Sequence, residues 1–113
     1  MAYNDNKDIL SWKRVLENLQ KKTDEGVEQY NKGYYYLTGT GDVKQSNNEA
    51  RKWFDLASKS NVAGVRYKIG RLYETGLFYK KDIEKAVFHY EFAANKGDIY
   101  AINNLAILYL KGT

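Results

Sequence analysis

Apolar and small residues recur along the chain at spacings of three and four, the period of one face of an α-helix. Two stretches share the same steps of four, one and three residues. They are Val65, Ile69, Gly70 and Tyr73, and Ala101, Leu105, Ala106 and Tyr109. The aromatic run 34–36 would suit a strand by composition alone. However, the register around this run is helical and no segment alternates with period two, so the sequence predicts an all-α protein.

The glycines follow a longer period. A small residue, a tyrosine and a glycine recur at spacings of three in three places, 37 and then 36 residues apart. These triplets are Gly33, Tyr36 and Gly39; Gly70, Tyr73 and Gly76; and Ala106, Tyr109 and Gly112. A second pattern recurs after 36 residues, as Ala50, Trp53, Phe54 and Ala57 and then as Ala86, His89, Tyr90 and Ala93. Two linked patterns indicate an internal repeat built from two helices.

Start and stop signals divide the chain into six expected helices. The helices are predicted at about 7–22, 25–38, 47–59, 62–75, 82–96 and 98–111. Ser46 or Asn47, Asp82 and Asp98 are the expected N-caps, and the glycine that ends each triplet suits a left-handed helix stop. The helices from 25 to 96 form two antiparallel pairs, and the last helix has no partner of its own.

The same pattern predicts the domain organisation. Residues 1–25 are expected to form an N-terminal capping helix, with Ile9, Trp12, Leu16 and Leu19 on one stripe. Residues 26–113 then hold the repeats, at about 26–61 and 62–97, with a partial third at 98–113. Repeats of this size bury a continuous core only by stacking on their neighbours.

The two linked patterns resemble the Sel1-like repeat family, relatives of the tetratricopeptide repeats. The family motif runs roughly Ala-x-x-x-Leu-Gly-x-x-Tyr-x-x-Gly and then Lys-Ala-x-x-Trp-Tyr/Phe-x-x-Ala-Ala. The first repeat departs from it, with Glu28 at the alanine position and Lys32 at the leucine position. The resemblance covers about residues 27–113 and implies a right-handed α/α superhelix. It also implies a binding scaffold or adaptor without chemistry of its own.

Composition argues against catalysis and metal binding. The 113 residues include no cysteine and one histidine, so disulfides, thiol chemistry and histidine or cysteine metal clusters are excluded. His89 stands where the first repeat has Trp53, and we interpret it as a packing residue, because Lys85 and Ala93 offer it no acidic partner. We therefore expect no enzyme activity, no catalytic residue, no cofactor and no metal.

The charge and the chain ends limit the possible partners and compartment. Eighteen lysines and arginines against fourteen acids give a net charge of +4, and the longest basic runs are pairs. RNA or single-stranded nucleic acid stacking on the tyrosines stays an alternative, but the chain lacks a basic stripe. No stretch could span a membrane and the first residues lack a secretory core, so we expect a cytoplasmic protein without a membrane partner.

By analogy with tetratricopeptide arrays, the first helix of each pair lines a concave face. The expected partner-binding residues are Tyr30, Tyr34, Tyr67, Arg71, Glu74, Asn103 and Ile107. Tyrosine and arginine are common in interface hot spots, which favours a protein or peptide ligand. The protein would act as an adaptor or as an inhibitor of one partner, such as an immunity protein that covers a bacterial toxin. The competing interpretation is that these tyrosines only pack between helices.

Two further segments are candidate contacts. The last helix is apolar on more than one face, which predicts a homodimer or partner contact through Ile107 and Leu110, unless the chain is part of a longer array. The turn at 77–79 carries three bulky residues, Leu77, Phe78 and Tyr79. We expect these to pack locally, and a partner contact is the alternative.

Overall fold

Five α-helices form the part of the chain described by the structure, which is a computed structural model. It describes the backbone of residues 5–112 and the side chains of 9–19 and 25–112. The helices are α1 (Asp5–Thr38), α2 (Asn47–Ala57), α3 (Ala63–Thr75), α4 (Ile83–Asn95) and α5 (Ile99–Leu110). No strand occurs within residues 5–112. The all-α prediction is confirmed, and the run 34–36 lies in α1.

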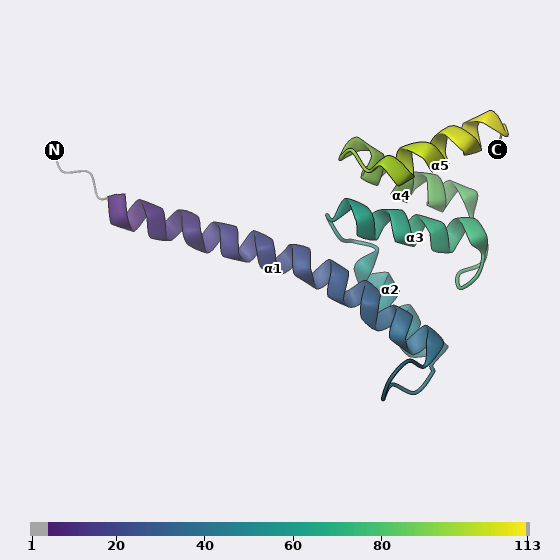
Figure 1. The fold of residues 1–113 in the computed structure, drawn as a ribbon, viewed down its shortest axis with the longest axis horizontal. Coiled ribbons are helices and arrows are strands. Elements are labelled where there is room, and N and C mark those ends of the chain that lie inside the picture. The colour runs from purple at the N-terminus through teal and green to yellow at the C-terminus, as the bar shows by residue number, and fades with distance from the viewer. Residues whose placement is uncertain (1–4, 113) are drawn as a thin grey trace.

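The helices are arranged as stacked pairs (Figure 1). The C-terminal half of α1 packs against α2, α3 packs against α4, and α5 packs on α4. The same backbone hydrogen bond joins the two helices of each complete pair at their connecting turn. In the first, the Ser46 N–H donates to the Tyr36 carbonyl, and in the second the Asp82 N–H donates to the Tyr73 carbonyl, both at 2.9 Å. This shared connection confirms that the two segments repeat one structural unit.

The expected helix signals lie where the sequence placed them. Side chains of Ser46, Asp82 and Asp98 accept hydrogen bonds from the N–H groups of the first turns of α2, α4 and α5, at 3.2, 3.0 and 2.9 Å. These bonds satisfy donors that have no partner inside the helix. Gly76 ends α3 with a φ of 71°, in the left-handed region that glycine adopts without strain.

The N-terminal region differs from the prediction. The helices expected at 7–22 and 25–38 are one continuous helix, so residues 5–112 form five helices where the sequence predicted six. No proline interrupts the chain, and Gly26 is not among the glycines with positive φ. Instead Gly26 lies against Ser60, where a Cβ would meet the Ser60 hydroxyl and Cβ. The helix therefore runs through the expected boundary.

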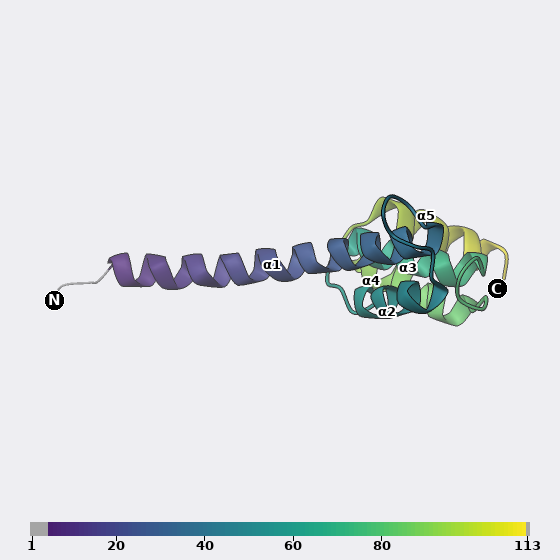
Figure 2. The ribbon, with the colours of Figure 1, turned by 90° about the horizontal axis from the view of Figure 1, so that it is seen from below.

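The expected capping helix is consequently the free end of α1. Figures 1 and 2 show this end projecting away from the stacked pairs. Its stripe of Ile9, Trp12, Leu16 and Leu19 is exposed. Within the described side chains, this stripe does not cover the first pair as a cap would. Residues 1–4 of the predicted cap and Thr113 of the third repeat lie outside the described residues.

Two connected cores hold the pairs together. Phe54 and Ile69 are completely buried in the first, and Tyr90 is completely buried in the second. Gly33 faces the Phe54 ring and Gly70 faces the Tyr90 ring, which explains the small residue in each stripe. Each aromatic ring fills the space that a side chain on the facing glycine would need.

Candidate functional site

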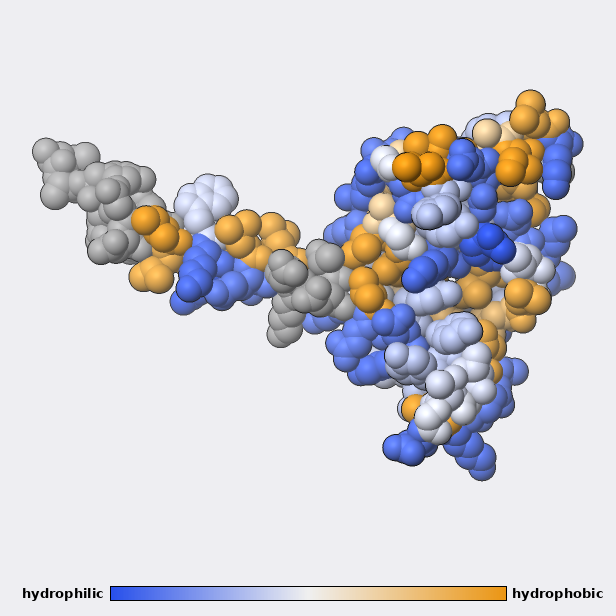
Figure 3. Space-filling view, in the orientation of Figure 1, coloured by the Kyte–Doolittle hydropathy of each residue, from blue (hydrophilic) through white to orange (hydrophobic). Residues whose placement is uncertain are grey.

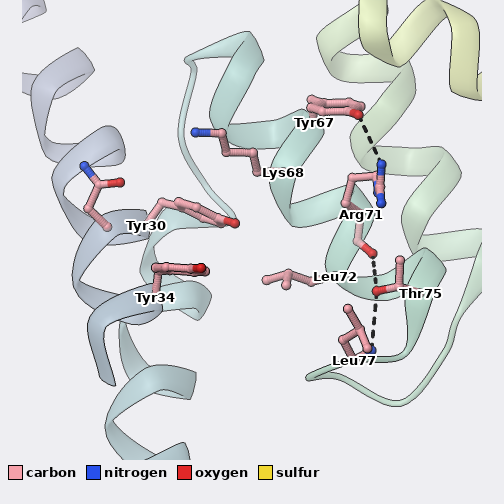
Figure 4. A pocket seen from close by; sticks show the side chains of 9 residues that line it. Tyr30, Tyr34, Tyr67, Lys68, Arg71, Leu72, Thr75 and Leu77 are labelled. Atoms are coloured by element: carbon pink, nitrogen blue, oxygen red, sulfur yellow. Dashed lines mark hydrogen bonds between the residues drawn. The ribbon is translucent and has the colours of Figure 1, made fainter. Parts of the chain in front are cut away.

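A groove between α1 and α3 brings together four of the expected partner-binding residues (Figure 4). Tyr30 and Tyr34 reach it from α1, and Tyr67 and Arg71 reach it from α3. The groove has a volume of about 420 Å³. Because α1 and α3 are the first helices of successive pairs, the groove lies on the face predicted from the repeat pattern.

The tyrosines combine packing with exposure. The Tyr30 ring lies 5.3 Å from the Phe54 ring, and the Tyr67 ring lies 5.8 Å from the Tyr90 ring. Both residues are partly buried, whereas Tyr34 is 48% exposed. Tyr30 and Tyr67 therefore pack between helices and also line the groove, and their binding to a partner stays a prediction.

Both charged side chains that line the groove are cations. Lys68 and Arg71 are the charged residues among its lining, and no acid contributes to it. Arg71 Nη1 donates to the Tyr67 hydroxyl at 3.5 Å, and this bond is the main reason why the pKa of Arg71 is raised. Lys68 Nζ lies 5.2 Å from the centre of the Tyr30 ring. Each cation is thus held against a tyrosine ring or hydroxyl at the groove.

Thr75 and Leu77 lie at the lower end of the groove in Figure 4, and the sequence did not place either of them beside the tyrosines. Thr75 Oγ1 donates to the Arg71 carbonyl at 2.8 Å and accepts from the Leu77 N–H at 3.4 Å. Leu77 borders the groove and is 82% exposed, so the local packing expected for it is wrong, whereas Phe78 and Tyr79 pack locally as expected. Lys68 and Thr75 lie one helical turn from Leu72 and Arg71, so their spacing could have indicated them.

The other expected site residues lie elsewhere. The Glu74 carboxylate accepts a hydrogen bond from the Tyr90 hydroxyl at 2.6 Å and does not line the groove. Asn103 and Ile107 are exposed on α5, away from the groove. Ile107 is 49% exposed and Leu110 is 87% exposed, and the homodimer expected through them stays a prediction.

His89 is part of the packing between α3 and α4. It is 7% exposed, stacks on Tyr73 with ring centres 5.8 Å apart, and accepts a hydrogen bond from Arg66 Nη1 at 3.3 Å. Burial, and then the charges of Arg66 and Lys85, lower its pKa to about 4. A base needs an acceptor free to take a proton, and here Nδ1 already faces a guanidinium.

Among the described residues, no three histidine, cysteine or acidic side chains come together in a way that could hold a metal ion. None of the helices in residues 5–112 is long and apolar enough to cross a membrane.

Stacked antiparallel helix pairs define an α/α solenoid. The particular family follows from the sequence. The chain belongs to the Sel1 repeat family, whose pattern matches residues 29–62, 65–98 and 99–113. Proteins of this family generally mediate protein–protein interactions, typically as non-enzymatic scaffolds.

Known proteins and structures support this assignment. The chain is 34% identical over 116 residues to the ERAD-associated E3 ubiquitin-protein ligase component HRD3B of Arabidopsis thaliana; the match covers 96% of this chain but only 18% of that relative's length. A Sel1 repeat protein from Oxalobacter formigenes is 29% identical, with a TM-score of 0.68 over 88% of this chain and 75% of the other. The protective antigen c5321 of uropathogenic Escherichia coli is 30% identical, with a TM-score of 0.69 over 87% of this chain and 21% of the other.

Proposed function

We propose that this protein is a non-enzymatic binding module that holds an acidic segment of a partner protein in the groove between α1 and α3. The observation that carries the proposal is the lining itself: tyrosines from two helices surround Lys68 and Arg71, with no acid among the lining residues. A carboxylate or other anionic group would find two cations there. The exposed Tyr34 ring would pack against apolar side chains next to that anionic group in the partner.

The fold suits this role energetically. Tyr30 and Tyr67 are held by contacts with Phe54 and Tyr90, so little side-chain freedom is lost when a partner binds. Tyrosine and arginine also contribute large contact areas together with hydrogen-bonding groups, which is why they dominate many interfaces. A groove formed before binding therefore favours affinity without a conformational change.

An adaptor and a dedicated inhibitor would use this groove in the same way. An adaptor would leave its partner active and hold it near another protein. An inhibitor, such as an immunity protein against a bacterial toxin, would cover the partner's own active surface. Measuring the partner's activity with and without saturating amounts of this protein distinguishes the two roles.

The test begins with affinity capture from the native host and identification of the retained protein. Calorimetry then compares its binding to the wild type and to Arg71→Ala, with Arg14→Ala as a matched control on the free end of α1. We expect Arg71→Ala to weaken binding about tenfold, the size of a typical hot-spot loss. Arg14→Ala should bind as the wild type does. Equal binding by all three proteins would refute the groove as the site.

The same material tests the nucleic-acid alternative. Binding of a labelled single-stranded RNA at about 50 and 200 mM salt would fall by orders of magnitude if several phosphates were contacted. We expect little RNA binding at either concentration, because the net charge of +4 is spread along the chain. Tight, salt-sensitive RNA binding that Arg71→Ala abolishes would replace the protein-partner proposal.

A further inference from the structure

The free end of α1 carries an apolar face that the groove does not use. We call Ile9, Trp12, Leu16 and Leu19 the α1 stripe. Their exposed fractions lie between 56% and 68%. Figure 3 shows apolar surface on this projecting segment, separate from the apolar surface near α5. Four large apolar side chains along one face of a projecting helix favour contact with another surface.

The α1 stripe continues an interface that already exists within the chain. Further along α1, Tyr30 and Gly33 meet the Phe54 ring of α2, and Gly26 meets Ser60 in the turn that follows α2. At 100° per residue, the stripe and these three residues point within about 50° of each other. The α1 stripe is therefore the extension of the α1–α2 interface beyond the end of α2.

The length of α1 that extends past this end follows from the position of Gly26. Helix α2 stops at Ala57, and Ser60 lies against Gly26. The backbone of α1 runs on for about 25 Å from Gly26 back to Ile9, and the described side chains of the stripe cover about 15 Å of it, from Leu19 to Ile9. A second helix packed along this face would lie in line with α2, just beyond its C-terminal end.

The spacing within the stripe indicates what kind of helix fits there. Steps of three, four and three residues place Ile9, Trp12, Leu16 and Leu19 at the alternating core positions of a two-helix seam. A matching stripe of the same length would suit it, and a second copy of the chain supplies one. We propose that two copies pair through their α1 stripes as an antiparallel helix pair.

The direction follows from α2. In a parallel pair, the second α1 would continue past Gly26 into the space where α2 lies, because α1 is one helix through Thr38. In an antiparallel pair, the second α1 begins near the end of α2 and runs in the same direction as α2. Ile9 then faces Leu19 of the second copy, and Trp12 faces Leu16 of the second copy. The positive end of that helix would follow the negative end of α2, which is favourable.

The exposed face of α5 is a poorer match for the α1 stripe than the stripe of a second copy is. In the two complete pairs, the second helix presents one aromatic ring between small residues, as Phe54 lies between Ala50 and Ala57. These small residues let the helices approach closely. On α5, Ala106 holds the position that Gly33 and Gly70 hold in the two complete pairs. Trp12 is flanked by the large side chains of Ile9 and Leu16, so the stripe cannot pack against Ala106 as closely as Phe54 packs against Gly33. The stripe therefore matches its own copy better than it matches α5.

We expect the dimer to be weak and reversible. The seam extends over about three helical turns, which puts its area at the low end for specific complexes. A dissociation constant on the order of 10 µM corresponds to about 7 kcal/mol. The repeat domains would lie at opposite ends of the helix pair, so both grooves would stay open and a dimer could bind a bivalent partner.

Sedimentation velocity from about 5 to 500 µM tests the pairing. The wild type should shift from monomer to dimer, Leu16→Lys should stay monomeric with an unchanged helical circular-dichroism signal, and Arg14→Ala should dimerise, because Arg14 points away from the stripe. Wild type that stays monomeric at 500 µM overturns the proposal. Dimerisation of Leu16→Lys would also overturn it. Loss of the dimer in the double variant Ile107→Lys and Leu110→Lys would overturn it too, because that result would place the contact on α5.

Disulfide trapping tests the direction, with no background because the chain has no cysteine. An equimolar mixture of Ile9→Cys and Leu19→Cys chains should form the mixed disulfide on mild oxidation, whereas Ile9→Cys alone should stay reduced. Rapid self-linking of Ile9→Cys would show a parallel pair and overturn the arrangement. Monomeric protein that co-sediments with anionic phosphatidylglycerol vesicles would show instead that the stripe lies on a membrane.

Discussion

Gly70 on α3 lies directly against the ring of Tyr90 on α4. A Cβ on Gly70 would be 2.6 Å from Tyr90 Cε1 and 3.3 Å from the Ala86 carbonyl oxygen. Gly33 and Phe54 stand in the same relationship in the first pair, also at 2.6 Å. The repeated glycine therefore makes room for the ring that forms the centre of each pair, and the cost of a glycine inside a helix is offset by this packing.

Gly70→Ala should lower the free energy of unfolding by about 1–3 kcal/mol, the usual cost of overfilling a packed core. Gly64→Ala is the control: it lies in the same helix, but a Cβ there meets nothing within 4 Å. This second change should be neutral or stabilising, because alanine favours helix. Urea unfolding of both variants provides the measurement, and equal stability of the two would contradict the packing argument.

Tyr90→Phe should destabilise the protein by about 1–2 kcal/mol. The Tyr90 hydroxyl donates to Glu74 at 2.6 Å and accepts from Asn104 Nδ2 at 3.2 Å, so its loss removes both hydrogen bonds. Glu74→Gln should also lower stability while leaving partner affinity unchanged. A loss of partner affinity at unchanged stability would restore Glu74 to the binding site.

Stability should fall as the pH drops from 7.5 to 5.5. His89 has its pKa lowered to about 4 in the folded chain, from the ordinary 6.5. Between these values the unfolded chain binds a proton that the folded chain does not, so lower pH favours unfolding. The free energy of unfolding should decrease by about 1 kcal/mol over this range. Urea unfolding at both pH values should show a much smaller decrease for His89→Gln.

Tyr34 and Tyr35 are neighbours with similar exposure, 48% and 44%, but only Tyr34 lines the groove. Tyr34→Ala should weaken the binding of the captured partner about tenfold. Tyr35→Ala should bind within twofold of the wild type, and both variants should keep nearly the same melting temperature. A larger loss from Tyr35→Ala would move the binding surface to the other side of α1.

Much of the fold could be predicted because its causes are local. Ser46, Asp82 and Asp98 cap helices through side chains three residues from the N–H groups that they accept from. Gly76 ends α3 because few other residues adopt its backbone conformation. The boundary expected between residues 22 and 25 was mispredicted: α1 is continuous there, and the neighbouring Gly26 lies against Ser60 inside the helix.

The candidate site was predictable only in part, because its composition also depends on contacts between separate helices. The repeat register placed Tyr30, Tyr34, Tyr67 and Arg71 on one face, and the structure gathers these four around the groove. Glu74 shares that register, but its carboxylate accepts from Tyr90, sixteen residues away in sequence. A helical period gives the direction of a side chain, whereas the neighbour that it meets depends on the packing of separate helices.

By itself, the sequence determined the helical class, the repeat of helix pairs and their caps, because these depend on spacings within a few turns. Only the tertiary structure decided that α1 is continuous and that its stripe projects beyond α2. It also decided that Lys68 and Leu77 join the tyrosines at the groove. These features depend on where one helix ends beside another, and that position is set by contacts between residues far apart in the chain.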